Sequence, residues 1–171
     1  MKIQIIGYSG SGKSTLSRKL SEKYNLPCLH IDTIQFLPNL KERDLKEKEI
    51  IVKNFLDNNQ DGWIIDGNYS KLSYDRRMNE ADLIIQLLFG RINCLLRCYK
   101  RFKKYSNSSR PDMAEGCAEK FDKTFVKWIL WGGRKKNIRD RYKRVRTLYS
   151  EKVIVIKNQK QLDRFLKSQN L

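Results

Sequence analysis

Nine residues near the start of the chain have the types and spacing to hold phosphate groups. The segment Gly7-Tyr8-Ser9-Gly10-Ser11-Gly12-Lys13-Ser14-Thr15 fits the pattern G-x-x-x-x-G-K-[S/T] and follows an apolar run of strand length. The glycines let consecutive backbone N–H groups point at one phosphate, and a helix beginning near Lys13 directs its positive dipole end there. We expect Lys13 to reach the β and γ phosphates of a nucleotide, and the Ser14 hydroxyl to ligate Mg²⁺.

Two aspartates follow other apolar runs. Asp66 ends the run Trp63-Ile64-Ile65-Asp66, where a Walker B carboxylate would place Mg²⁺. Asp32 follows the run at residues 28–31, where a carboxylate would orient or deprotonate an acceptor hydroxyl. His30, the single histidine, is as compatible with a structural hydrogen bond as with a substrate contact. Ligands of parallel sheets bind beyond the carboxyl ends of the strands, so we expect these side chains at one edge.

The residue after Asp66 favours one reaction class. Motor ATPases and helicases commonly place a glutamate there to activate water, whereas this chain has Gly67, which favours transfer to a bound acceptor over hydrolysis. The stretch at residues 158–163 has the wrong spacing for a guanine-binding signature, so a small GTPase is disfavoured.

Alternating periodicities predict the elements that position these residues. Apolar runs of strand length occur at residues 2–6, 28–31, 63–66, 83–88 and 153–156. Helical periodicity occurs at residues 41–58, 91–104, 117–131 and 159–167, and the last helix is preceded by Asn158 as an N-cap. Strands that alternate with helices predict a single α/β domain over residues 1–171, with a parallel sheet in three layers.

The segment 91–150 is about twice as long as one crossover needs, and we predict a basic helical insertion that closes over the site as a lid. Residues 91–146 carry 18 Lys and Arg against 5 Asp and Glu, whereas residues 1–90 carry 13 against 12. Such a segment clamps a polyanionic ligand, faces nucleic acid, or is a solvated basic face.

The cysteines and the lack of a long apolar run bear on metal binding and on location in the cell. The four cysteines form no C-x-x-C pair, which favours buried thiols over a zinc site. The sequence shows no apolar run of 18 residues and no charged-then-apolar leader, so we expect a cytoplasmic protein without a membrane anchor.

The phosphate loop, the charged segment and residues 63–69 resemble the adenylate-kinase-like P-loop kinases. The chain is also similar, over nearly its whole length, to a bacterial family known as DNA topology modulation proteins. This second resemblance rests on the blocks at residues 5–15, 29–38, 63–69, 113–117 and 119–122.

The resemblance implies a P-loop NTPase fold with a five-stranded parallel sheet, ATP and Mg²⁺ at the loop, and kinase chemistry. Asp66 and Gly67 match the Asp-Gly that borders the acceptor pocket of adenylate kinases. Arg97 and Arg101 match arginines that reach ATP at the base of the lid, and Arg134 resembles the arginine that moves onto the transferring phosphoryl group. Guanidinium groups suit these roles because they donate paired hydrogen bonds to phosphate oxygens.

One departure bears on the acceptor. Adenylate kinases continue the Asp-Gly with Phe-Pro-Arg, whose arginine grips a monophosphate, whereas this chain continues with Asn68-Tyr69-Ser70 and has arginines only at Arg76 and Arg77. Nucleotide, nucleoside and small-alcohol acceptors therefore stay open. We expect a metabolic kinase, and the alternative is a nucleic-acid-associated ATP-binding regulator that uses residues 91–146.

Overall fold

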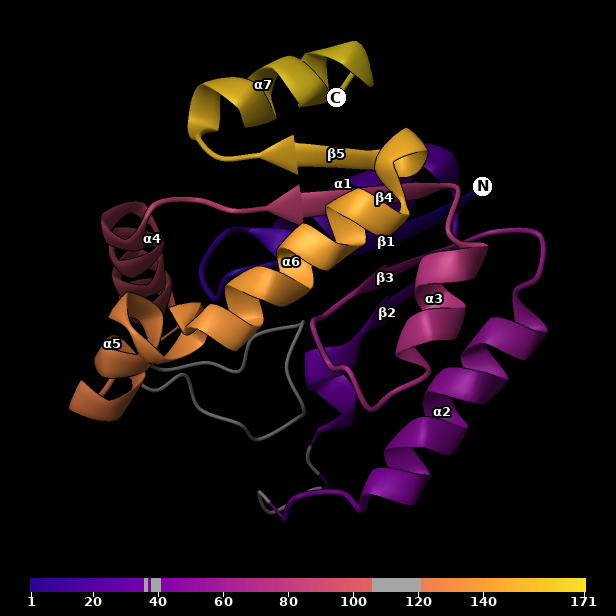
Figure 1. Cartoon of the computed structure of the whole chain (residues 1–171), viewed down its shortest axis with the longest axis horizontal. Helices are drawn as coiled ribbons and strands as arrows, with labels where there is room; N and C mark the ends of the chain where they lie inside the picture. Colours follow the sequence, from indigo (N-terminus) through magenta and orange to yellow (C-terminus); the bar gives the residue numbers. More distant parts are fainter. Residues whose placement is uncertain (36, 38–40, 106–120) are drawn as a thin grey trace.

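The computed structural model describes residues 1–35, 37, 41–105 and 121–171. Five parallel strands form one sheet with the order β2-β3-β1-β4-β5 (Figure 1). The strands are β1 (Lys2–Gly7), β2 (Cys28–His30), β3 (Trp63–Asp66), β4 (Leu83–Leu87) and β5 (Val153–Ile156). The predicted three-layer α/β fold with a parallel sheet of five strands is therefore confirmed.

Helices follow the strands along the chain and connect them. They are α1 (Lys13–Tyr24), α2 (Leu45–Asn58), α3 (Tyr74–Glu80), α4 (Arg91–Lys104), α5 (Lys123–Leu130), α6 (Lys136–Leu148) and α7 (Gln159–Ser168). Short 3-10 turns lie at Ile31–Ile34, Gly132–Arg134 and Ser150–Lys152.

The sheet has an apolar core on each face. Leu16 and Leu20 of α1 and Phe165 of α7 pack in one core. In the other core, side chains of α2, α3 and α6 pack on the opposite face of the sheet. Both faces are covered because parallel strands are joined by crossover helices, and the strand ends are left as the exposed edge where loops gather.

Local capping explains where several helices begin. The helix expected over residues 41–58 begins at Leu45, because the Asp44 carboxylate accepts a hydrogen bond from the Lys46 N–H at 2.8 Å. The helix expected over residues 117–131 is described from Lys123 to Leu130, with Asp122 as its cap, and residues 117–120 lie outside the described part. The predicted cap at Asn158 is confirmed by a 2.9 Å bond from the Gln161 N–H.

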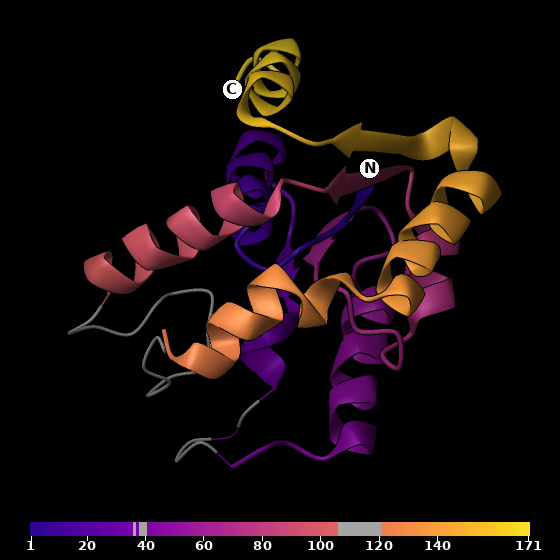
Figure 2. The ribbon, with the colours of Figure 1, turned by 60° about the vertical axis from the view of Figure 1, so that its left-hand side comes forward.

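The basic segment 91–150 divides into two kinds of structure. Helices α4 and α5 extend beyond the carboxyl ends of the strands (Figures 1 and 2). Helix α6 instead packs on the sheet, where Tyr142 and Val145 are buried and the Gln86 side chain donates to the Tyr142 carbonyl at 3.1 Å. Helix α6 thus covers one face of the sheet, and closure of the segment 91–150 over the site as a lid stays a prediction.

Within the described ranges, no helix is long and apolar enough to cross a membrane. The thiols of Cys94 and Cys98 are buried, Cys28 is half-buried, and Cys117 lies in a range that is not described. The blocks at residues 113–117 and 119–120, on which part of the family resemblance depends, lie in that range as well.

Candidate functional site: a phosphate loop and its surroundings

The loop between β1 and α1 depends on glycine at two positions, for close packing at Gly10 and for a positive φ at both Gly10 and Gly12. Gly10 has a φ of 76°, and a Cβ there would lie 2.6 Å from the Cys94 carbonyl oxygen and 2.5 Å from the Cys98 sulfur. Gly12 has a φ of 97° as well, a region that L residues rarely adopt. The two glycines therefore let the loop curl against α4 while its backbone faces the strand edge.

The start of α1 has the features of an anion site. In the part of the chain that the structure describes, no side chain caps this helix, so the N–H groups of its first turn have no side-chain acceptor there. The Ser11 hydroxyl is buried and has no hydrogen-bond partner among the described residues. Unpaired donors at a helix N-terminus fit a phosphate group, since the helix dipole favours negative charge at the same point.

Three cationic side chains surround this loop, and each is bound to backbone carbonyls. The Lys13 Nζ donates to the Tyr8 carbonyl at 3.1 Å, and Arg97 donates to the Ser11 carbonyl at 3.0 Å. Arg134 donates to the Phe89 carbonyl at 2.9 Å. No carboxylate of the described residues forms an ion pair with any of the three. The structure thus brings Arg97 and Arg134 to the loop, and Arg101 lies one turn farther along α4.

A cavity of about 300 Å³ opens beside the helical end of the loop. Its lining comes from the loop, α1, α4 and α7: Gly12, Thr15, Leu16, Lys19, Arg97, Gln159, Leu162 and Leu166. Arg97 also donates to the side chain of Gln159 and so joins α4 to the start of α7. Sequence analysis missed the contribution of α7, because the hydrophobic pattern of that helix indicates only a packed face.

The Asp66 carboxylate is buried at the end of β3, next to α1. Its Oδ2 accepts a 2.6 Å bond from the Ser17 hydroxyl and lies 2.9 Å from His30 Nδ1. Ser17 is one helical turn from Ser14, and its hydroxyl oxygen also lies 3.1 Å from the Ser14 carbonyl oxygen. Asp66 therefore connects to the predicted metal ligand through Ser17. Hydroxyl and carboxylate oxygens are the ligands that Mg²⁺ prefers, so this set would fit the ion, and Asp66 would then act as an outer-shell group.

The environment of His30 favours its charged form. Burial opposes the charge, but hydrogen bonds to Asp66 and Cys28 outweigh it and raise the pKa of His30 to about 10. Of the two readings left open by the sequence, the described contacts of His30 are those of a structural partner for Asp66.

The segment after β3 carries a second carboxylate contact. The Tyr69 hydroxyl donates to Asp32 Oδ1 at 2.7 Å, which joins the end of β2 to this segment. Burial, followed by the charge of Asp32, raises the pKa of the Tyr69 hydroxyl. Gly67, at the start of this segment, has a φ of 139°, and a Cβ there would lie 2.9 Å from the Ile31 side chain. Asp32 is thus held with one oxygen engaged.

Arg76 and Arg77, which follow this segment, already have hydrogen-bond or ion-pair partners. Arg77 is fully buried and donates to Gln4 Oε1 at 2.9 Å and to the Tyr69 carbonyl at 2.7 Å. Burial lowers the pKa of Arg77 to about 10. Arg76 pairs with Asp57 at 2.6 Å and with Glu80. Neither guanidinium group is placed to grip a monophosphate in the manner of the adenylate-kinase arginine.

The sheet order, the glycine loop and the helices on both faces together define the fold of the P-loop kinases. Solved structures with this fold include deoxyadenosine kinase from M. mycoides with bound dATP, which is 16% identical, covers 100% of both chains and has a TM-score of 0.56. The structure of deoxyadenosine kinase from M. mycoides with the products dCMP and a flexible dCDP is also 16% identical, covers 99% of both chains and has a TM-score of 0.51. The likeness at this identity shows the fold.

The chain matches no protein-family model and no curated protein. The resemblance to DNA topology modulation proteins stays a prediction.

Proposed function

We propose that the chain is a kinase that transfers the γ-phosphoryl group of ATP to a hydroxyl group of a small molecule or nucleoside. The observation that carries this proposal is the convergence of Lys13, Arg97 and Arg134 on a glycine loop, where each donates to a backbone carbonyl and none forms an ion pair with a carboxylate of the described residues. Phosphate oxygens are stronger acceptors than carbonyls, so a bound triphosphate would attract all three.

The cavity beside Gly12 suggests how ATP, the phosphoryl donor, would be oriented. We place the adenine of ATP in the space between Arg97, Gln159 and Leu162, because this cavity adjoins the helical end of the loop. The phosphates then extend along the loop toward Lys13. Cationic groups that face the transferring phosphoryl group stabilise the charge that spreads over its oxygens in the transition state.

The divalent ion has a place in this arrangement. Ser14 would ligate Mg²⁺, and Asp66 would position the shell of the ion through Ser17. Bound Mg²⁺ supplies neutralisation of the phosphate charge.

The acceptor side favours a hydroxyl over a phosphate. Asp32 keeps one oxygen that is not bonded to Tyr69, which would accept the proton of an acceptor hydroxyl as its oxygen attacks the γ-phosphorus. The bond from the γ-phosphorus to the bridging oxygen then breaks, and ADP leaves. Arg76 and Arg77 are engaged with partners of their own, which argues against a nucleoside monophosphate as acceptor.

An acceptor screen tests the proposal. ADP release from ATP and Mg²⁺ is measured with nucleosides, nucleoside monophosphates and small alcohols, with deoxyadenosine as the first acceptor. We expect turnover with an alcohol or nucleoside and none in Lys13→Ala. The unfolding midpoint of this variant should match that of the wild type, because Lys13 is only half-buried and its ammonium donates its hydrogen bond to the Tyr8 carbonyl of the loop. Turnover that persists in Lys13→Ala would place the reactive centre elsewhere.

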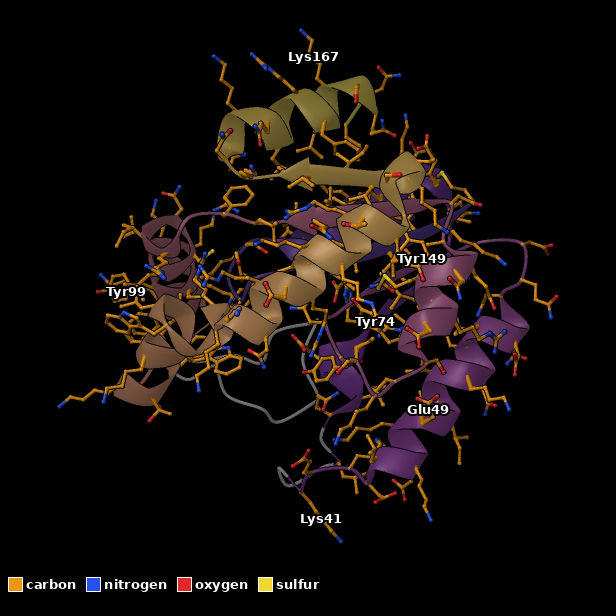
Figure 3. The ribbon with its side chains drawn as sticks, viewed as in Figure 1. Lys41, Glu49, Tyr74, Tyr99, Tyr149 and Lys167 are labelled. Carbon is orange, nitrogen blue, oxygen red and sulfur yellow. The ribbon has the colours of Figure 1, made fainter. Side chains whose placement is uncertain are left out.

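One observation favours the nucleic-acid alternative and another opposes it. Helix α6 and the residue before it expose Lys135, Lys136, Arg139, Lys143 and Arg144, a cluster suited to a phosphate backbone. Two aromatic residues of the basic segment, Tyr99 and Tyr142, already contact other rings, although Tyr99 is still 41% exposed. Tyr99 lies against Phe121 at 5.4 Å between ring centroids, at the outer side of α4 (Figure 3), and Tyr142 is buried under Tyr8. A surface for stacking bases is thus weakly supported.

A further inference from the structure

The Trp128 side chain reaches the phosphate loop from α5. Its indole N–H donates to the Ser9 hydroxyl at 3.3 Å across 119 positions of sequence. Yet the residue is 48% exposed, although an indole is among the most apolar surfaces a chain can present. A large aromatic residue that is held at a loop and still half exposed is placed to contact a ligand.

The turn after α5 is shaped around this indole. A Cβ on Gly132 would lie 2.8 Å from Trp128 Cε3, and a Cβ on Gly133 would lie 3.3 Å from Nε1. Side chains at either position would displace the ring. Because both positions are glycine, the indole lies against the turn on one side and reaches Ser9 with its N–H edge.

Ser9 belongs to the end of the loop that would hold the terminal phosphate. The cavity assigned to the base is lined by Gly12 and Thr15, at the helical end of the loop. The Lys13 ammonium, which reaches β and γ phosphates in such loops, lies at the opposite end on the carbonyl of Tyr8. Ser9 is the neighbour of Tyr8, so Trp128 approaches the γ end of the site.

Arg134 approaches the same end from the same segment. Its guanidinium lies 3.8 Å from the centre of the Tyr8 ring. Trp128 and Arg134 therefore present one neutral donor and one cation to neighbouring residues of the loop, Tyr8 and Ser9.

We propose that the indole N–H of Trp128 donates to the terminal phosphate of a bound nucleoside triphosphate, in place of the Ser9 hydroxyl. This assignment rests on the proposed function, since it requires a nucleotide in the loop. A bond of 3.3 Å is longer than the usual 2.9 to 3.0 Å for N–H to oxygen, and a charged phosphate oxygen is a stronger acceptor than a hydroxyl. The ligand that Trp128 recognises is thus a triphosphate, and a diphosphate lacks the group it contacts.

Calorimetry on Trp128→Phe tests the assignment, because phenylalanine keeps an aromatic ring and removes the donor. Affinities are measured for a non-hydrolysable ATP analogue and for ADP, both with Mg²⁺. We expect the triphosphate to bind about tenfold or more weakly, the scale of one hydrogen bond to a charged group, and ADP to bind nearly as in the wild type. Trp131→Phe is the matched control, since Trp131 is 61% exposed on the same segment and should change neither affinity.

A second variant keeps the tryptophan and moves it. Gly132→Ala places a methyl group against the indole, so it should also reduce the preference for triphosphate over diphosphate. In Trp131→Phe, the remaining tryptophans are Trp128 and the fully buried Trp63. The tryptophan fluorescence of this variant should therefore change more on addition of the triphosphate analogue than on addition of ADP.

The outcomes separate the two proposals. If the wild type binds both nucleotides, and Trp128→Phe and Gly132→Ala weaken both equally or neither, the Trp128 assignment is overturned and the nucleotide site stands. If the wild type binds neither nucleotide, the proposed function fails and this assignment fails with it.

Discussion

The Asn68 side chain is bonded to both backbone groups of Gly7. Its Oδ1 accepts from the Gly7 N–H at 2.9 Å, and its Nδ2 donates to the Gly7 carbonyl at 2.6 Å. Asn68, which follows Gly67 just after the end of β3, thereby fixes the point at which β1 turns into the phosphate loop. Sequence analysis named Asn68 only as a departure from a family pattern.

Asn68→Ala should loosen the loop. Loss of the two bonds leaves the Gly7 groups unpaired in a partly buried place, so we expect a stability loss of about 1 to 3 kcal/mol and weaker ATP binding. Urea unfolding and nucleotide titration measure the two effects. Asn79→Ala is the control. Asn79 lies on α3, away from the loop, and accepts a hydrogen bond from the Tyr149 hydroxyl, so its loss should lower stability without a change in ATP affinity.

Asp66→Asn should weaken the response to Mg²⁺ far more than nucleotide binding without Mg²⁺. The amide keeps an acceptor for Ser17 but removes the charge that would position the ion, and loss of such an outer-shell group typically costs about 10 to 100-fold in metal affinity. Titration of activity with Mg²⁺ provides the measurement. Asp82→Asn, at the Lys2 N–H, is a charge-matched control. Equal losses with and without Mg²⁺ would make Asp66 a structural residue.

The free energy of unfolding should fall as the pH rises from about 6.5 toward 10, because His30 loses its proton over this range. The folded-state pKa is raised to about 10, above the unfolded value of 6.5, so the contribution of the imidazolium is complete below pH 6.5 and is lost as the pH approaches 10. The slope from this group is at most about 1.4 kcal/mol per pH unit. Urea unfolding of the wild type and His30→Gln between pH 6 and pH 10 should give curves that converge at high pH. Parallel curves would mean that His30 is neutral in the fold.

The arginines and lysines of the basic segment should separate kinase chemistry from nucleic-acid binding. Arg97→Ala should slow phosphoryl transfer by raising its activation free energy by roughly 3 kcal/mol or less, the scale of one transition-state contact. Joint replacement of Lys135, Lys136 and Lys143 by glutamine should leave the transfer rate nearly intact, since these side chains are exposed and outside the loop.

The same triple variant measures any role in DNA binding. If the surface binds DNA, the salt slope of its affinity should fall by up to about 3, or about one unit for each lost phosphate contact. A loss of DNA binding in the triple variant, with no phosphoryl transfer by the wild type, would favour the regulator over the kinase.

The sequence alone predicted the features that depend on local pattern. The phosphate loop, the five strands and the helix at Arg91–Lys104 could be recognised because turn chemistry and apolar periodicity act between near neighbours. The placement of Asp66 beside α1 follows from the same logic, since carboxyl ends of parallel strands share one edge.

Only the tertiary structure decided which side chains meet across the sheet. Arg77 is buried and donates to Gln4 of β1 and to the Tyr69 carbonyl, neutral partners that lie outside its own helix. Trp128 lies at Ser9, and Asn68 is bonded to Gly7, through contacts that no periodicity encodes. Such contacts depend on the packing of whole elements, and packing is a property of the folded chain rather than of any segment.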